Sequence, residues 1–93
     1  MLESKIEQKF TLMVKSRGGM APKWVSPGML GVPDRIALLP DGKIGFVELK
    51  APGKKPRAAQ LARQQQLEAL GFKVFVVDDA SQIEEVLDAI QGS

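Results

Sequence analysis

Two apolar segments on either side of a short turn are the feature of this sequence that most constrains its fold. Residues 36–39 and 44–47 are apolar, and they flank Pro40-Asp41-Gly42, whose residue types favour tight turns. This pattern predicts a β-hairpin, in which two strands pair antiparallel and their ends far from the turn meet. A residue just before the first strand should therefore lie beside the residues that follow the second.

Three ionisable residues fall at that end of the predicted hairpin. Asp34 precedes the first strand, and Glu48 and Lys50 end the second, where the alternation of side chains puts them on one face. Two carboxylates held close together repel, and one of them would normally keep a proton. A hard divalent cation such as Mg²⁺ removes this conflict, because it prefers oxygen ligands and makes a bound water more acidic. A lysine beside that water could orient or deprotonate it for attack on a phosphodiester.

The spacing of these residues resembles that of a known group of nucleases. Pro33-Asp34 is followed, after thirteen residues, by Glu48-Leu49-Lys50. This arrangement is similar to the motif of the PD-(D/E)xK nuclease superfamily. Either half of the motif occurs by chance in many proteins, whereas both halves on one predicted hairpin are more specific.

The composition narrows the chemistry that the chain could use. Its 93 residues fit one domain, which we expect to cover residues 1–93. There is no cysteine, histidine or tyrosine, which excludes histidine–metal nucleases, serine–histidine hydrolases and tyrosine recombinases. Residues 1–5 lack a signal-peptide pattern, and no apolar stretch is long enough to span a membrane. We therefore expect a cytoplasmic protein.

Charge is distributed unevenly along the chain. Residues 1–33 carry five basic and two acidic side chains, residues 34–60 six and three, and residues 61–93 two and six. The candidate site lies in the basic part, which suits a polyanionic substrate such as DNA. A solubilising surface is the alternative explanation of the same distribution.

A basic, proline-rich loop at residues 51–57 adjoins the candidate site. Its position next to carboxylates that would act on phosphate favours contacts to a nucleic-acid backbone over a merely solvated surface. The basic residues that we expect to contact DNA are Lys54, Lys55 and Arg57 of this loop, with Lys23 and Arg35 outside it.

The remaining pattern predicts helices and strands in the order α-β-β-β-α-β-α. Helices are expected over residues 2–17, 57–70 and the stretch after 81, and strands over 23–26, the two hairpin segments and 72–77. The last strand should be buried on both faces, and Ser81 and Glu84 resemble a capping box. Trp24 is expected in the core, with base stacking as the alternative. The fold class is thus α/β with a mixed sheet of four strands.

Almost the whole chain is similar to stand-alone, phage-type VRR-NUC domains of the PD-(D/E)xK superfamily. The resemblance rests on the first helix with Gly18-Gly19, Ser26-Pro27-Gly28, residues 31–36, residues 46–50, Gln60 and Gly71. It implies a restriction-endonuclease-like αβββαβ core with a C-terminal helix. It also implies that Asp34, Glu48 and the carbonyl of Leu49 bind metal and that Lys50 positions the attacking water. Gln60 would support the site, and Glu7, chosen over Glu3, would serve it from the first helix.

The expected function is therefore that of a Mg²⁺- or Mn²⁺-dependent DNA endonuclease. The resemblance implies a homodimer, which should cut branched DNA such as a Holliday junction. Met20, Met29 and Leu30 are apolar residues that could cover one another between two copies. One alternative is a catalytically silent DNA-binding module with the same fold. Another is an α/β interaction domain, which would leave Asp34, Glu48 and Lys50 unexplained.

Overall fold

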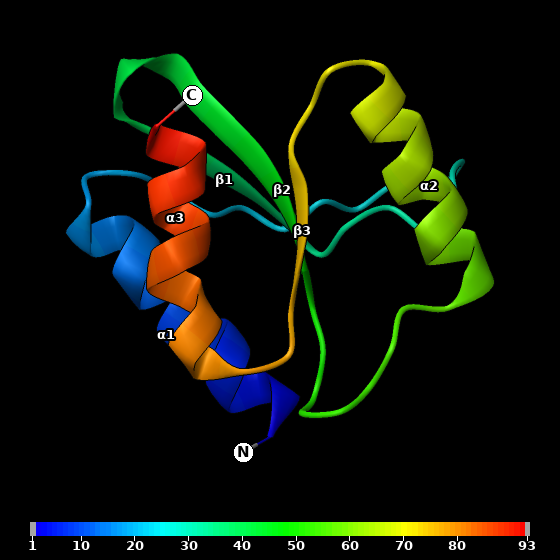
Figure 1. The fold of residues 1–93 in the computed structure, drawn as a ribbon, viewed down its shortest axis with the longest axis horizontal. Helices are drawn as coiled ribbons and strands as arrows, with labels where there is room; N and C mark the ends of the chain where they lie inside the picture. Colours follow the sequence, from blue (N-terminus) through cyan, green and yellow to red (C-terminus); the bar gives the residue numbers. More distant parts are fainter. Residues whose placement is uncertain (1, 93) are drawn as a thin grey trace.

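The computed structural model describes residues 2–92 and shows a small mixed sheet with helices on both faces (Figure 1). Two of the helices, α1 and α3, lie together on one side of the sheet, and α2 lies on the other side. The elements are α1 (Glu3–Ser16), β1 (Arg35–Leu39), β2 (Lys43–Leu49), α2 (Ala58–Ala69), β3 (Val74–Val77) and α3 (Ile83–Gln91), with short 3-10 turns at Pro40–Gly42 and Ala80–Gln82.

The predicted hairpin is present and supplies two neighbouring strands of the sheet. Strands β1 and β2 pair antiparallel from Leu39 opposite Lys43 to Arg35 opposite Val47. The turn takes its left-handed step at Asp41, with φ of 67°, a conformation that aspartate tolerates better than most residues. Strand β3 pairs with β2 in parallel, so the strand order is β1-β2-β3 and the sheet is mixed, as predicted.

The prediction of a fourth strand at residues 23–26 is wrong. The chain before β1 makes only two isolated bridges to it, Met20 with Leu38 and Lys23 with Arg35. Between the two bridges Pro22 accepts a hydrogen bond from the N–H of Ile36 (3.0 Å) but has no N–H to return. The sheet of the described residues therefore has three strands.

The core lies between the sheet and the pair α1 and α3. Helix α1 contributes Ile6, Phe10 and Val14, whereas Leu2, which precedes it, is exposed. Helix α3 contributes four apolar residues at helical spacing, all of them buried: Ile83, Val86, Leu87 and Ile90. At the hairpin turn α3 packs closely on β2, since a Cβ added at Gly45 would lie 2.6 Å from Cδ1 of Ile90.

Two details of the C-terminal half differ from the prediction. Strand β3 begins at Val74 and is fully buried only at Val77, because it is an edge strand with one pairing partner. The predicted capping box of Ser81 and Glu84 is wrong. Instead, the side chain of Asp79 accepts a hydrogen bond from the N–H of Ser81 (2.9 Å), and a 3-10 turn leads into α3.

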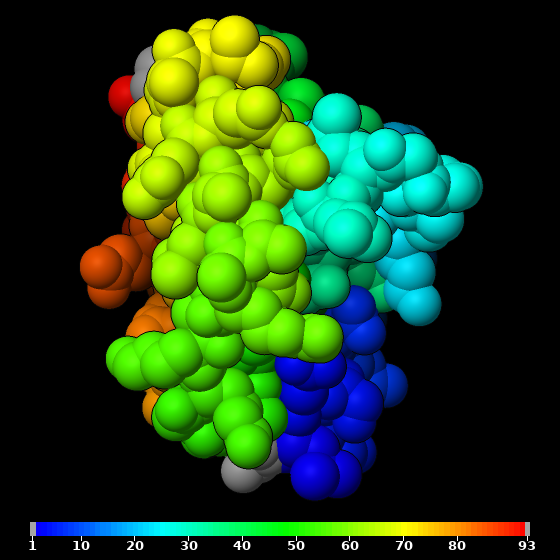
Figure 2. All heavy atoms as spheres, turned by 90° about the vertical axis from the view of Figure 1, so that its right-hand side faces the viewer, coloured from blue at the N-terminus to red at the C-terminus, as the bar shows by residue number. Residues whose placement is uncertain are grey.

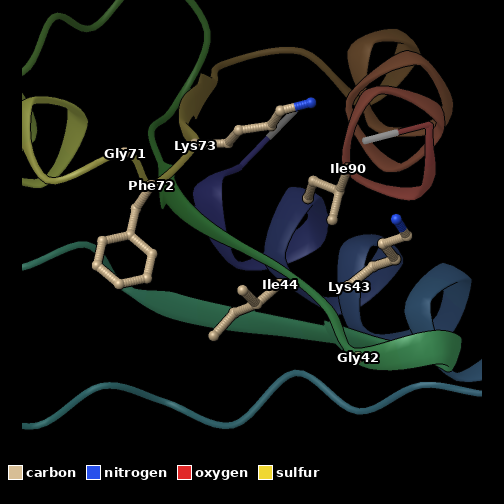
Figure 3. A pocket seen from close by; sticks show the side chains of 7 residues that line it. All are labelled: Gly42, Lys43, Ile44, Gly71, Phe72, Lys73 and Ile90. Atoms are coloured by element: carbon tan, nitrogen blue, oxygen red, sulfur yellow. The ribbon is translucent and has the colours of Figure 1, made fainter.

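A hollow of about 200 Å³ lies at the hairpin-turn end of the sheet (Figure 3). Ile44 and Phe72 lie on one side of β2 there, and Ile90 lies on the other. The ammonium of Lys73 donates a hydrogen bond to the carbonyl of Ala89 in the last turn of α3 (2.9 Å). A cation at this position stabilises the C-terminal end of the helix. The residues around this hollow therefore attach α3 to the sheet.

Among the residues that the structure describes, no helix has the length and apolar character needed to cross a membrane.

Candidate active site

Strand pairing brings Asp34 and Glu48 together, as the sequence predicts. Because Arg35 pairs with Val47, the next position outward places Asp34 level with Glu48. The carboxylate of Asp34 accepts a hydrogen bond from the N–H of Leu49 (2.7 Å), and its carbonyl accepts one from the N–H of Trp24 (3.0 Å). Asp34 is therefore fixed from both sides, by β2 and by the segment that runs beside β1.

Glu48 is a carboxyl group almost completely removed from solvent. Its exposed fraction is 1%, and among the described residues neither carboxylate oxygen has a hydrogen-bond partner. Burial raises the pKa of Glu48 to about 8, and the neighbouring Asp34 adds to the shift. Since neither carboxylate carries a donor, the two can bond only when one of them is protonated. A buried, unpaired carboxylate costs folding free energy, so this site needs an explanation beyond stability.

Lys50 lies directly after β2, and its backbone is anchored to the neighbouring strand. Its N–H donates a hydrogen bond to the carbonyl of Val77 (2.9 Å). Its side chain is partly exposed, and its charge acts on the pKa of Glu48 in the direction opposite to burial and Asp34. A lysine with access to solvent therefore follows the two carboxylates at this end of the hairpin.

The oxygen atoms at this end of the sheet fit a hard divalent cation. Asp34 and Glu48 offer carboxylate oxygens, and the unpaired oxygens of Glu48 would gain the partner that they lack in the chain. Within residues 2–92 no group of three or more acidic, histidine or cysteine side chains gathers to hold a metal. Water and the predicted carbonyl of Leu49 would thus complete the coordination, in keeping with the habit of Mg²⁺ to retain several waters.

The two residues predicted to support the site have other partners in the structure. The carboxylate of Glu7 faces the Nε of Arg35 at 3.3 Å. Glu3, by contrast, adds its charge to burial and Asp34 in raising the pKa of Glu48. The side-chain oxygen of Gln60 accepts a hydrogen bond from the N–H of Arg57 (2.8 Å) and so caps the start of α2. The roles of Glu7 and Gln60 in the site stay predictions.

The basic residues predicted to contact DNA fall into two groups. Lys54, Lys55 and Arg57 are exposed on the loop between β2 and α2, and Lys23 is exposed beside β1. Figure 2 shows this loop (green) at the start of α2 and next to the beginning of α1 (blue). The guanidinium of Arg35 is instead held by Glu7 and by the carbonyl of Ala21 (2.8 Å). It therefore has little freedom to reach a ligand.

The sequence did not reveal how the α2 side of the sheet is filled. The ring of Phe46 lies 5.1 Å from that of Trp24 and 5.5 Å from that of Phe72, measured between centroids. Phe46 shares its face of β2 with Glu48, so this aromatic cluster packs on the side of the sheet to which the carboxyl group points. The core role predicted for Trp24 is consistent with this packing. The alternation of Phe46 and Glu48 on one strand was the signal that could have indicated a buried glutamate.

Comparisons with known proteins identify the class to which this fold belongs. The search against family models found no match. A solved structure described as "VRR_NUC domain" superimposes with a TM-score of 0.86 at 28% identity, covering 95% of this chain and 97% of that one. The protein "Putative nuclease p44" of Acyrthosiphon pisum secondary endosymbiont phage 1 is 48% identical over 88 residues, covering 95% of this chain and 94% of its own. The chain belongs to the VRR-NUC nuclease family, as its sequence motifs predicted.

The buried carboxyl group predicts how stability without metal depends on pH. The pKa of Glu48 is raised from 4.5 to about 8 in the folded chain, so between these pH values the folded state binds more protons than the unfolded state. The free energy of unfolding in EDTA should therefore fall as the pH rises from about 5 to about 8, with each pKa unit contributing about 1.4 kcal/mol. Urea titrations of the wild type at both pH values measure this change. Glu48→Gln should flatten it, and an equally steep loss in that variant would place the cause elsewhere.

Proposed function

We propose that this protein is a divalent-metal-dependent DNA endonuclease in which Asp34 and Glu48 hold the ion. The observation that carries the proposal is the solvent-excluded Glu48, whose oxygens lack partners among the described residues and which lies level with Asp34. Mg²⁺ or Mn²⁺ suits this all-oxygen donor set. The phage relative described as a nuclease supports the activity, and the same relative favours a phage-encoded enzyme that acts in the cytoplasm of a bacterial host.

The chain's own residues divide the work of hydrolysis. When bound, the ion would neutralise the two carboxylates and supply a more acidic water next to the scissile phosphate. The carboxylate of Asp34 is held by its hydrogen bond from the N–H of Leu49, so its oxygens keep a fixed position relative to β2. Lys50, adjacent to the carboxylates and partly open to solvent, orients the attacking water and stabilises the negative charge that develops on it. The burial of Glu48 keeps bulk water away from its carboxyl group.

The direct test of this function is a titration of metal into a mixture of protein and branched DNA. Cleavage that requires Mg²⁺ or Mn²⁺ supports the nuclease. Binding of the same DNA in EDTA with no cleavage at any metal concentration would favour the catalytically silent module. Failure to bind would favour an interaction domain without a nucleic-acid role.

The exposed basic loop supplies a second prediction. If Lys54, Lys55 and Arg57 contact phosphates, changing each to Ala should weaken binding to all DNA sequences alike. Each change should also lower the slope of log affinity against log salt by about 1, because each contact releases a counterion. Fluorescence anisotropy at several salt concentrations in EDTA measures both effects. Lys15→Ala, which removes an exposed charge at the far end of α1, is the control. A triple variant with unchanged salt dependence would show that the loop is only a solvated surface.

A third prediction concerns assembly. Met20 pairs with Leu38 across the sheet and is 63% exposed, and Ile44 and Phe72 are exposed beyond them. This apolar strip lies on the side of the sheet that α2 covers only in part, and a second copy is the partner that would bury it.

Two sites related by a two-fold axis suit the two strands of like polarity in a four-way junction. Light scattering should give about twice the chain mass of 10.1 kDa, and the dimer should make paired nicks in a junction. Met20→Glu should yield monomers; a wild-type monomer at all concentrations would end this proposal.

A further inference from the structure

The loop between residues 26 and 33 has an exposed apolar tip, formed by Met29 and Leu30. Leu30 is 78% exposed and its neighbour Met29 is 43% exposed, although both lie next to ordered structure. In Figure 2 this loop (cyan) projects beside α2 and away from the body of the domain. Two adjacent apolar side chains that reach into solvent cost hydration free energy, and the core does not use them.

The tip is held rigidly rather than left free. Gly31 takes a left-handed conformation with φ of 78°, and a Cβ at this position would lie 2.4 Å from the carbonyl oxygen of Ala59. The loop backbone therefore touches the first turn of α2, which only glycine permits. The guanidinium of Arg63 on α2 also donates a hydrogen bond to the carbonyl of Leu30 (2.9 Å). The side chain of Leu30 is thus presented from a backbone that α2 fixes.

The tip lies close to the candidate active site, both along the chain and through the hollow beside it. A hollow of about 350 Å³ lies between the tip and the start of α2, and Arg57 of the basic loop and Gln60 line it. The same loop leads within four residues to Asp34, whose carboxylate is bonded to β2. One short segment therefore carries an apolar projection, adjoins an arginine and fixes a carboxylate that the proposed reaction needs.

We propose that the Met29–Leu30 tip is a wedge that packs against an unstacked base where DNA strands branch. Apolar side chains inserted at a base step replace stacking, and neighbouring cations bind the flanking phosphates. Arg57 and the basic loop provide those cations beside the tip. A branch point presents bases with incomplete stacking, so the wedge favours branched over continuous duplex. This inference rests on the proposal that DNA is the substrate, and it assigns the recognition of structure to the tip rather than to the carboxylates.

The experiment uses four-way DNA carrying 2-aminopurine next to the branch point, in EDTA so that no cleavage occurs. The wild type should increase the fluorescence of this base, because unstacking relieves its quenching. Leu30→Ala should show little of this fluorescence increase. Its affinity for the junction should be roughly tenfold lower, as expected for one lost base contact. Its affinity for linear duplex should stay unchanged, because the basic loop is intact. Leu30→Met should restore the signal, since it keeps an apolar side chain of similar size.

Leu12→Ala is the matched control, because Leu12 is another exposed leucine (62%) on α1, on the other side of the sheet. It should behave as the wild type. A Leu30→Ala protein with the wild-type fluorescence increase would overturn the wedge, and so would one that became monomeric, because the tip would then contact a second copy. A wild type that binds no DNA would refute the nuclease function and the wedge together. A wild type that cleaves DNA while Leu30→Ala matches it would refute the wedge alone.

Discussion

Replacing Glu48 with Gln is expected to reduce DNA cleavage by roughly a thousandfold while leaving the fold and the affinity for DNA intact. The amide keeps the shape of the side chain but removes the charge that would hold the ion, and loss of several kcal/mol of transition-state stabilisation corresponds to a factor of this size. Binding to DNA should not change, because Glu48 is 1% exposed and cannot itself touch a phosphate. Single-turnover cleavage and anisotropy in EDTA separate the two effects.

Asp34→Asn should give the same loss of cleavage, since its remaining carbonyl oxygen can still accept the hydrogen bond from the N–H of Leu49. Glu68→Gln is the matched control: Glu68 is an exposed glutamate on α2, so this change removes a charge without touching the site. Glu3→Gln and Glu7→Gln, measured beside it, show which glutamate of α1 serves the reaction. A Glu48→Gln enzyme that cleaved at the wild-type rate would refute the assignment of the carboxylates.

Replacing Lys50 with Ala should reduce the cleavage rate by about a hundredfold to ten-thousandfold, the range that one general acid or base contributes. The backbone bond from Lys50 to Val77 does not depend on the side chain, so the strand should keep its position. Metal should still bind, and more tightly if anything, since a positive charge beside Glu48 is removed. The measurement is the single-turnover rate at saturating metal across a range of pH.

A merely structural role for Lys50 would leave the shape of the pH profile unchanged, whereas a role in orienting or deprotonating water should alter it. Lys54→Ala is the matched control, because it removes a nearby loop lysine that we expect to affect affinity rather than rate. Equal effects of the two changes on the rate at saturating protein would refute the separate role of Lys50.

The sequence predicted the β1–β2 hairpin correctly because a hairpin depends on residues that are close together along the chain. A turn of Pro40-Asp41-Gly42 between two apolar segments has few alternatives to a hairpin, and once the hairpin exists, Asp34 and Glu48 must lie level. The spacing of the four large apolar residues in α3 likewise fits only a helix that buries one face, because their side chains all lie on that face. The fold class and the placement of Asp34 beside Glu48 therefore followed from periodicity and from one motif.

What the sequence could not reveal depends on contacts between distant segments. Residues 20–24 meet β1 only through isolated bridges, and the pattern of residues 23–26 did not show that their partner would lie beside Pro22, which has no N–H to donate. The guanidinium of Arg35 is occupied because α1 brings Glu7 beneath it, twenty-eight residues away along the chain. Burial of Glu48 likewise depends on the segments that pack on its face of β2, which the pattern of the strand alone does not show. Charge patterns alone could not distinguish a basic residue that is available to DNA from one that is already paired.

The measurement that tests the central claim most directly is calorimetric titration of Mn²⁺ into the wild type and Glu48→Gln at pH 8, with the unfolding temperature of each recorded with and without metal. If Asp34 and Glu48 hold the ion, the wild type should bind it and gain thermal stability, since a ligand that binds only the folded state stabilises it. Glu48→Gln should be the more stable protein in EDTA and should gain nothing from Mn²⁺. Equal binding and equal stabilisation of both proteins would contradict a metal site at this end of the hairpin.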